Sequence, residues 1–406
     1  MGLTSRLAAL FGGGSARHGE AGAAGGTEAK SAGLAMTGGA FLLTGPGPGA
    51  RGARSYEALS RTGFMGNPVV YRAVRLIAEA ASAIPLVLQK EGREFDDHPV
   101  LDRLRRPNGM QDRASLFEML IGHMLLAGNA YVEASGADGS IAALYALRPD
   151  RVRTIADADG WPDAYEYRVG TAVRRIAAEG DGARPSTILH LRLFHPLSDQ
   201  LGFAPLSAAE AALDLHNAAA SWNAALLKNS ARPSGALVYQ PADGSNLSVE
   251  QFDRLKAELE SGYAGAAVAG RPMLLEGGLD WKAMALTPKD MDFMEARHGA
   301  ARDIALAFGV PPMLMGIPGD LTYANYSEAN RAFYRLTVLP LIQKMTGAIG
   351  AWLGELAGED GLELGIDLDA VEGLSSEREA LWARVSQADF LTRDEKRQAV
   401  GYGAGG

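Results

Sequence analysis

The chain has 406 residues, 47% hydrophobic and 21% charged, a composition typical of a globular protein with two or three domains. The absence of cysteine excludes disulfides, thiolate zinc sites and cysteine nucleophiles, and suits a reducing cytoplasm. The net charge of −9 disfavours tight nucleic-acid binding, which uses lysine and arginine at phosphates, but is compatible with DNA that passes without being held. No run of eighteen apolar residues occurs, so no transmembrane helix is expected.

The first 54 residues are rich in glycine and alanine and predict a flexible tail, with a binding arm as the alternative. The apolar stretch from Leu3 to Phe11 is too short for a signal peptide and lacks a good charged start. Arg6 stands where an N-myristoylation pattern needs serine or threonine.

The first folded element is a helix that opens at Asn67 and Pro68, because asparagine caps a helix and proline suits its first position. Pro85 ends this helix, and 86–89 reads as a strand. One face of the helix is apolar and carries Val70, Val74, Ile77, Ala81 and Ile84.

A second helix is expected over 115–127 and ends at Gly128. Two strands follow around a Gly-Ala-Asp-Gly turn. Three more strands are expected over 164–169, 172–176 and 187–193.

An alanine-rich helix spans about 207–229 and favours close packing against other helices. A small α/β insert follows. A strand begins at Val238, the pair Ser248 and Gln251 predicts a capping box at a helix start, and 279–286 reads as a strand.

The stretch from Thr287 to Leu356 organises the rest of the chain. It predicts an amphipathic helix over 288–308 that stops at Gly309, and a loop over 313–325. A helix of about 45 Å follows over 326–356, with a kink at Pro340, because proline removes a backbone donor and clashes with the preceding turn.

The C-terminal part predicts a strand over 362–368 and a helix over 377–390. Thr392 and Glu395 form a second capping box and open a last helix.

Chemical motifs are scarce. His190 and His195 lack a third ligand, and five residues along a strand separates them onto opposite faces, so a zinc site is disfavoured. No ATP-binding signature occurs, and no Gly-x-Ser-x-Gly elbow supports a triad drawn from Ser186 or Ser207, His190 or His216, and Asp214.

Several stretches nevertheless form an ordered set. They read NPVVYRAVRLIAEAASAIPLVLQ, HPVLDRLRRPN, FEMLIGHMLLAGNAYVE, LRPDRVR, NSARPSG and GVPPMLMGIPGDLTYANYSEANRAFYRLTVLPLIQKM. The set spans roughly 55–368 and resembles the portal proteins of HK97-type tailed bacteriophages, with the portal of a prophage and that of an alphaproteobacterial gene transfer agent as the two alternatives. A further stretch, GFAPL at 202–206, has Ala204 where the family usually has serine, and NSARPSG has Ser230 where glycine is usual.

The resemblance implies an α+β portal fold with a wing, an α-helical stem, a small α/β clip and a short helical crown. The implied domains are a flexible tail 1–54, wing 55–205, stem helix 206–232, clip 233–286, stem helix 287–312, tunnel loop 313–325, long kinked wing helix and strand 326–368, and crown with a disordered tail 369–406.

The resemblance also implies a non-enzymatic, cofactor-free ring of twelve subunits with double-stranded DNA in its channel. The implied partners are the terminase large subunit, the head-to-tail connector and the major capsid protein, with no membrane. The implied location is a virion or phage-like particle assembled in the bacterial cytoplasm. The residues expected to face DNA are Asp320, Leu321, Thr322, Tyr323 and Asn325, with Lys228 and Lys289 as candidate channel charges. The alternatives are a serine hydrolase built on Ser186, His190 and Asp214, and a ring adaptor without DNA passage.

Overall fold

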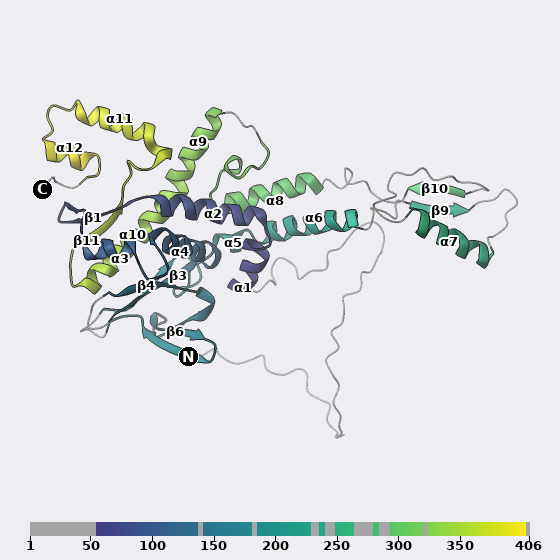
Figure 1. Ribbon diagram of the computed structural model, residues 1–406, viewed down its shortest axis with the longest axis horizontal. Helices are drawn as coiled ribbons and strands as arrows, with labels where there is room; N and C mark the ends of the chain where they lie inside the picture. Colours follow the sequence, from purple (N-terminus) through teal and green to yellow (C-terminus); the bar gives the residue numbers. More distant parts are fainter. Residues whose placement is uncertain are drawn as a thin grey trace, which may run out of the picture. The chain divides into compact units, whose positions relative to one another are not determined.

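The computed structural model describes residues 54–136, 141–180, 185–228, 235–239, 248–263, 279–283, 293–319 and 323–402 (Figure 1). The described residues belong to one compact unit. Its helices are α1 Tyr56–Leu59, α2 Pro68–Ala83, α3 Pro99–Arg105, α4 Arg113–Ala127, α5 Pro205–Ala208, α6 Glu210–Lys228, α7 Val249–Tyr263, α8 Phe293–Ala307, α9 Tyr323–Phe333, α10 Leu339–Ala357, α11 Ser375–Ser386 and α12 Arg393–Ala399. The strands are β1 Leu86–Lys90, β2 Arg93–Phe95, β3 Asn129–Ser135, β4 Ala143–Leu147, β5 Val152–Ala156, β6 Pro162–Val169, β7 Ala172–Ala177, β8 Ile188–Arg192, β9 Gly235–Tyr239, β10 Leu279–Ala283 and β11 Leu362–Ile366.

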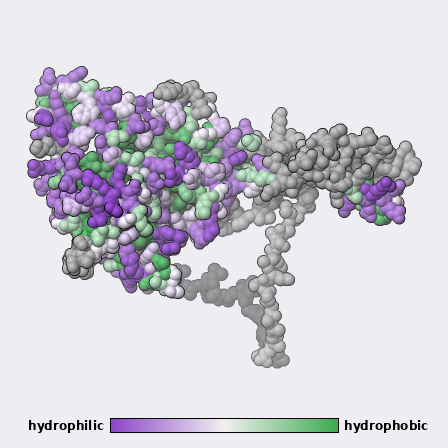
Figure 2. Space-filling model, viewed as in Figure 1, coloured by the Kyte–Doolittle hydropathy of each residue, from purple (hydrophilic) through white to green (hydrophobic). Residues whose placement is uncertain are grey.

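The main core lies where α2, α4 and α10 meet. Asn67 caps α2 by accepting from the backbone N–H groups of Val69 and Val70, and Pro68 takes the first helical position, as predicted. The five apolar residues predicted for the inner face of this helix region are all buried. On the face seen in Figure 2, hydrophilic residues predominate and apolar patches are scattered among them.

All strand pairs within the described ranges are antiparallel. One sheet has the order β11-β1-β2 and joins distant parts of the chain, with Leu88 opposite Leu364. The others have the orders β4-β3-β8 and β5-β6-β7, with β9 and β10 as a separate pair. The strands predicted over 164–169, 172–176 and 187–193 are confirmed, whereas β2, β5 and α3 were missed because these segments are short and lack clear periodicity.

Helices α6 and α8 pack side by side (Figure 1). The predicted helix over 207–229 is interrupted: α5 ends at Ala208, Ala209 leaves helical geometry with ψ of 5°, and α6 begins at Glu210. Leu213 of α6 and Ile304 of α8 are fully buried. The alanine-rich composition therefore does accompany close helix packing, here with a second helix of the same chain.

The long helix begins earlier than predicted, at Tyr323 rather than 326. The interruption of this helix also differs from the predicted kink at Pro340. A π-helical turn, Tyr334–Val338, separates α9 from α10, and Pro340 is the second residue of α10. The N–H of Leu339 bonds to the carbonyl of Tyr334, five residues back, and this wider turn gives room to a proline ring that would clash in a regular helix.

Among the described residues, one helical segment, Asn325–Ala357, is long and apolar enough to cross a bilayer by length and composition alone. The sequence has no unbroken run of eighteen apolar residues, so no transmembrane helix was predicted in this segment. Half of its apolar window is buried inside the protein, with Ile342 and Met345 fully enclosed. Core helices of this kind satisfy the same test, so the segment's apolar character is accounted for by packing.

The other local predictions are mostly confirmed. Gly128 ends α4 with φ of +74°, and the capping box of Thr392 and Glu395 opens α12. Ser248 and Gln251 cap α7 reciprocally through side chain and backbone. The helix expected over 377–390 runs over Ser375–Ser386 instead.

Candidate functional site

The segment that joins α8 to α9 begins with a hydrogen-bonded cap at the C-terminus of α8. Gly309 has φ of +67°, and its N–H bonds to the carbonyl of Leu306 at 3.0 Å. The N–H of Val310 bonds to the carbonyl of Ala305 at 2.9 Å. These two bonds form a Schellman motif, which requires the left-handed conformation that glycine adopts without strain. The predicted helix stop at Gly309 is confirmed.

Beyond this stop the chain makes a 3-10 turn, Pro312–Met315, and folds back onto α8. Ile317 is buried against Ala301 and Ala305 of α8. Nη2 of Arg302 donates to the carbonyl oxygen of Pro318 at 2.7 Å. The described part of the predicted loop is therefore attached to α8 by the apolar contacts of Ile317 and by a charge-assisted hydrogen bond.

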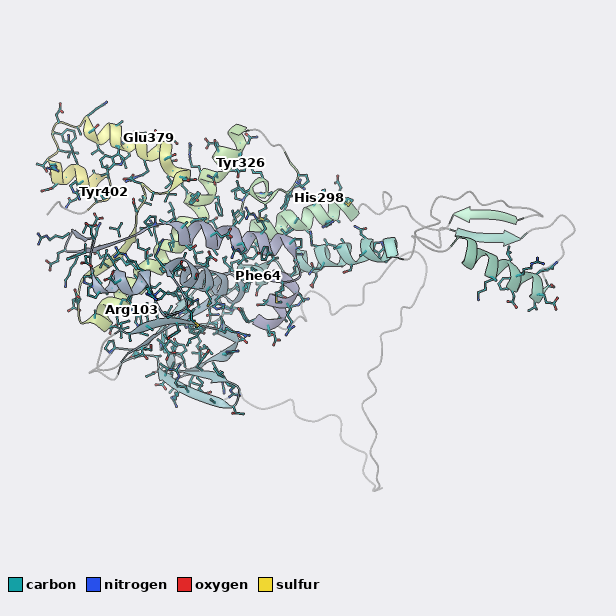
Figure 3. All side chains as sticks on the ribbon, viewed as in Figure 1. Phe64, Arg103, His298, Tyr326, Glu379 and Tyr402 are labelled. Atoms are coloured by element: carbon teal, nitrogen blue, oxygen red, sulfur yellow. The ribbon has the colours of Figure 1, made fainter. Side chains whose placement is uncertain are left out.

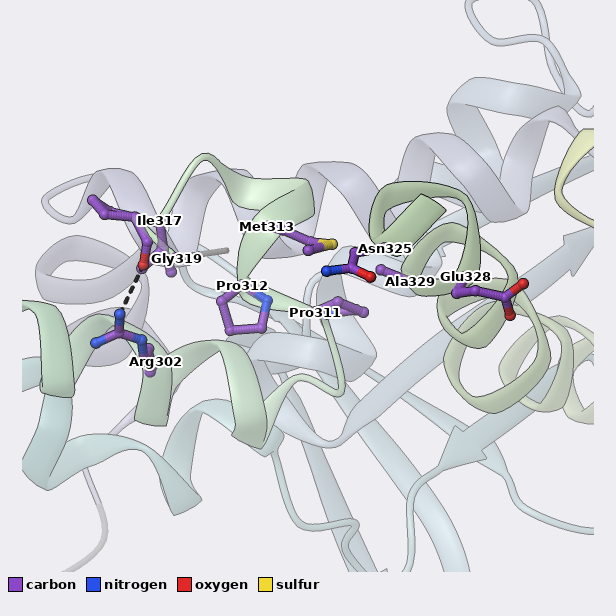
Figure 4. Close-up of a pocket in the computed structure, with 10 residues that line it drawn as sticks. Arg302, Pro311, Pro312, Met313, Ile317, Gly319, Asn325, Glu328 and Ala329 are labelled. Atoms are coloured by element: carbon purple, nitrogen blue, oxygen red, sulfur yellow. Dashed lines mark hydrogen bonds between the residues drawn. The ribbon is translucent and has the colours of Figure 1, made fainter. Parts of the chain in front are cut away.

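A pocket of about 440 Å³ lies between this turn, α8 and the start of α9 (Figure 4). Its wall is mostly apolar, and charged groups of both signs, Arg302 and Glu328, lie at its edge. The lining residues are Arg302, Pro311, Pro312, Met313, Ile317, Pro318, Gly319, Asn325, Glu328 and Ala329.

The structure places the predicted DNA-facing residues unevenly. Asn325 is exposed and lines the pocket, but it lies in the first turn of α9 and not in a loop. Tyr323 is the first residue of α9. The loop was predicted to run from 313 to 325, but α9 begins at Tyr323, so the C-terminal boundary of the predicted loop is wrong. Asp320, Leu321 and Thr322 lie outside the described residues, as do Lys289 and the side chains of Lys228 and Tyr323.

The long helix is attached to the C-terminal helices beside the π-helical turn. Arg331 and Arg335 each lie 3.6 Å from a carboxylate oxygen of Glu377 on α11. Tyr326 projects from α9 and Glu379 from α11 (Figure 3). These ion pairs link the segment that carries Tyr323 and Asn325 to the end of the chain.

A polar network that the sequence did not reveal joins α2, α6 and α8. Nδ2 of Asn67 donates to Oδ1 of Asn217 at 2.8 Å and lies 3.0 Å from Nδ1 of His216. Nε of Arg297 on α8 lies 3.4 Å from Nε2 of the same histidine. Burial, and then the nearby Arg297 cation, lowers the pKa of His216. Asn67 was predicted only as a cap, since spacing along the chain carries no signal for contacts 150 residues away.

The hydrolase alternative is not supported by the positions of its three residues. The amide of Asn129 is oriented by bonds to the backbone of Gly202 and Ala127. Its oxygen therefore accepts from Nε2 of His190 at 2.9 Å, and Nδ1 accepts from the hydroxyl of Tyr165. Both ring nitrogens are thus engaged and unavailable as a general base.

The two other members of that triad also have partners elsewhere. Oγ of Ser186 donates to the carbonyl of Ala177 at 2.9 Å. Asp214 accepts from Nη2 of Arg54 at 2.7 Å. Within the described ranges, no three histidine or acidic side chains lie close enough together to hold a metal ion.

Comparisons with known proteins agree with the architecture. A family model described as "Phage portal protein" matches residues 68–401. An uncharacterized protein of Rickettsia bellii is 40% identical over 337 residues, 82% of this chain and 86% of that protein. The portal protein of Enterobacteria phage HK97 is 25% identical over 348 residues, 81% and 77% of the two chains.

A solved structure is also similar. It is described as the neck of a native GTA particle computed with C12 symmetry, and its chain is 52% identical, with a TM-score of 0.69 over 88% of this chain and 96% of that one. The family model covers the chain from α2 to α12. This chain, a mixed α+β protein of structural and non-enzymatic kind, belongs to the phage portal protein family.

Proposed function

We propose that this chain is the portal of a gene transfer agent or closely similar phage-like particle. Twelve copies form a ring at one vertex of the capsid, in the particle's neck. The observation that carries the proposal is the match, at 52% identity over 88% of the chain, to a protein in the neck of a GTA particle computed with C12 symmetry. The family model over residues 68–401 supports it independently.

The proposed channel carries double-stranded DNA during packaging and ejection. The chain's net charge of −9 suits passage without tight binding, since few phosphate counterions are displaced. The segment 313–322 with Tyr323 and Asn325 is proposed to face the DNA. Lys228 and Lys289 are proposed as isolated positive charges along the channel.

Within each subunit we assign the wing to 55–205 and 326–368, the stem to α6 and α8, the clip to 233–286 and the crown to residues after 368. The clip docks the terminase large subunit and the head-to-tail connector, and the wing contacts the major capsid protein. Since the sequence shows no ATP-binding signature, the energy for moving DNA comes from the terminase.

A direct test is the mass of the purified protein. Twelve chains of 42.7 kDa give about 510 kDa, and negative-stain images should show a ring with a central hole. A stable monomer, both alone and in assembled particles, would refute the proposal.

The second candidate, a ring adaptor without DNA passage, needs a different test. Replacing Tyr323 and Asn325 together by alanine should impair DNA packaging or retention if these residues face DNA, while rings still form. The matched control is Tyr145→Ala, an exposed tyrosine on β4. Normal DNA content in particles that carry the double variant would favour the adaptor.

A further inference from the structure

Helix α9 is anchored at its C-terminal end and exposed toward its N-terminal end (Figure 1). Phe333, its last residue, is buried in the main core, whereas residues 325–328 are exposed. The helix packs against the turn Pro312–Met315 and against a second 3-10 turn, Glu372–Leu374, which precedes α11. The direction of α9 therefore depends on contacts near its anchored end and on these two turns.

The π-helical turn Tyr334–Val338 joins α9 to α10 and interrupts the regular helical hydrogen bonding between them. Helices bend sharply at such turns, so α9 and α10 do not form one rigid rod. The distance along the helix from Leu336, in the middle of the turn, to Tyr323 is about 20 Å at 1.5 Å per residue. A rotation of about 15° at the turn would therefore move the proposed DNA-facing residues by about 5 Å.

The 3-10 turn Glu372–Leu374 provides a fixed support beside this joint. Val371 and Leu374 are buried in the main core. A Cβ atom added to Gly373 would lie 3.0 Å from both Cγ and Cε2 of the Tyr334 ring, so the ring lies directly against the backbone of the glycine. The lack of a side chain at residue 373 thus determines how closely the π-helical turn approaches the C-terminal part of the chain.

Glu377, in the first turn of α11, extends this support across the joint. Its Oε1 lies 3.6 Å from Nε of Arg331 on α9 and 3.6 Å from Nη1 of Arg335 in the π-helical turn. Arg331 also donates to Oγ of Ser376 at 3.1 Å and pairs with Glu328 on its own helix. Half-exposed ion pairs of this kind add little to overall stability, but a carboxylate shared by both sides of a joint favours one angle between them.

We propose that Glu377 is a positioning residue that sets the direction of α9, and with it the place of Tyr323 and Asn325 in the DNA channel. A rotation of α9 about the π-helical turn would separate Arg331 from the carboxylate that Arg335 shares. The close contact between the Tyr334 ring and the C-terminal turn limits the same rotation. The inference rests on the proposed function, because it assigns these residues to a channel, but the position of α9 can also be measured on the free chain.

Spin labels can measure this position, because the chain has no cysteine of its own. Labels at Tyr326→Cys on α9 and Met110→Cys, at two exposed positions, report the distance between α9 and the proposed wing in rings diluted with unlabelled chains. Glu377→Arg should shift this distance by about 3 Å or more, because like charges then meet at the joint. The charge swap Arg335→Glu/Glu377→Arg should restore most of the original distance, since it recreates an opposite pair.

The matched control is Glu379→Arg, at an exposed glutamate of the same helix (Figure 3), which should leave the distance unchanged. An unchanged distance in Glu377→Arg would overturn the inference. So would a shift of equal size in Glu379→Arg, because the effect would then be one of charge on α11 in general.

The DNA content of assembled particles is the functional test. Glu377→Arg should lower the fraction of DNA-filled particles by about threefold to fivefold, the change in population expected when one exposed ion pair is lost, while ring mass stays normal. The charge swap with Arg335→Glu should recover most of this loss, which a merely destabilising substitution would not do. A displaced α9 with normal DNA content would overturn the inference. If the unmodified chain forms no ring, the proposed function fails, whereas the label distance in the free chain still decides whether Glu377 positions α9.

Discussion

The hydroxyl of Thr337 donates a hydrogen bond to the carbonyl oxygen of Gly309, with 2.5 Å between the two oxygens. The bond joins the π-helical turn of the long helix to the stop that ends α8. A Cβ atom on Gly309 would lie 2.7 Å from the same hydroxyl. The two segments thus meet closely because residue 309 has no side chain, and this sets where the proposed DNA-facing segment starts.

We expect Gly309→Ala to lower the free energy of unfolding by roughly 2 kcal/mol or more, because a left-handed alanine is strained and its methyl group meets Thr337. Thr337→Ala should cost about 1 kcal/mol, the usual value of one hydrogen bond. Urea unfolding of both variants and of the double variant checks this. The double variant should lose less than the sum, since the alanine at 337 relieves the clash, and strict additivity would contradict the argument.

Asp369 holds the C-terminal helices together. Its carboxylate accepts hydrogen bonds from Nε of Arg378, from Nε1 of Trp382 at 3.1 Å and from the hydroxyl of Tyr402 at 2.7 Å. We expect Asp369→Asn to weaken this attachment by roughly 2 kcal/mol, because the bond to Arg378 loses its charge assistance. Faster hydrogen exchange in α11 and α12, with α2 and α4 unchanged, is the expected result. Hydrogen-exchange rates equal to those of wild type in α11 and α12 would contradict this prediction.

The same carboxylate predicts a pH dependence at the acid end. Its hydrogen bond with Arg378 is the main cause that lowers the pKa of Asp369 from 3.8 to about 2. A group whose pKa is lower in the folded state stabilises fully above its unfolded pKa and loses this contribution as pH falls through the folded value. The exchange difference between wild type and Asp369→Asn should therefore narrow between about pH 4 and pH 2. A difference that stays constant over this window would exclude the ionised carboxylate as its cause.

Buried His190 predicts that stability is also lost on acidification, and that this loss begins at a higher pH than the loss due to Asp369. Burial, and secondarily Arg192, lowers the pKa of His190 from 6.5 to about 3. The unfolded chain binds the proton between these values and the folded chain does not, so stability falls as pH drops below 6.5. The slope for one such proton approaches about 1.4 kcal/mol per pH unit.

The variant His190→Gln isolates this histidine's share. It should be less stable at neutral pH, because the bonds to Asn129 and Tyr165 are disturbed. Its unfolding free energy should nevertheless depend less steeply on pH between 6.5 and about 4.5. His123, whose pKa burial lowers to about 4, keeps part of the slope in both proteins. If the unfolding free energy from urea titrations had the same pH dependence in wild type and His190→Gln, the assignment of this pH dependence to His190 would be wrong.

Asn67 allows its two structural roles to be separated. Asn67→Ala should cost roughly 2–4 kcal/mol, because it removes the cap of α2 and the amide group that contacts Oδ1 of Asn217 and Nδ1 of His216. Asn67→Asp keeps the capping oxygen but loses the amide donor. Thermal unfolding should rank both variants below wild type. If aspartate fully restores stability, the contacts to α6 contribute nothing.

Local features of this protein could be derived from the sequence, since they depend on neighbours a few residues apart. The caps at Asn67 and Thr392, the stops at Gly128 and Gly309 and the buried face of α2 follow from side-chain chemistry and periodicity alone. The ordered motifs also identified the portal family, which the family model over 68–401 confirms. The bounds of the candidate site were less accurate, because Tyr323 and Asn325 belong to α9 and not to the loop that was predicted to run to residue 325.

Tertiary structure alone decided which distant groups meet. Leu88 pairs with Leu364, and Asn67 reaches His216, across separations that leave no periodic trace in the chain. The proline-containing helix is divided into α9, a π-helical turn and α10, where the sequence predicted a simple kink at Pro340. Local interactions of about 1 kcal/mol determine where helices begin and end. Which elements pack together is determined by the burial of whole faces, and this depends on all the surfaces at once.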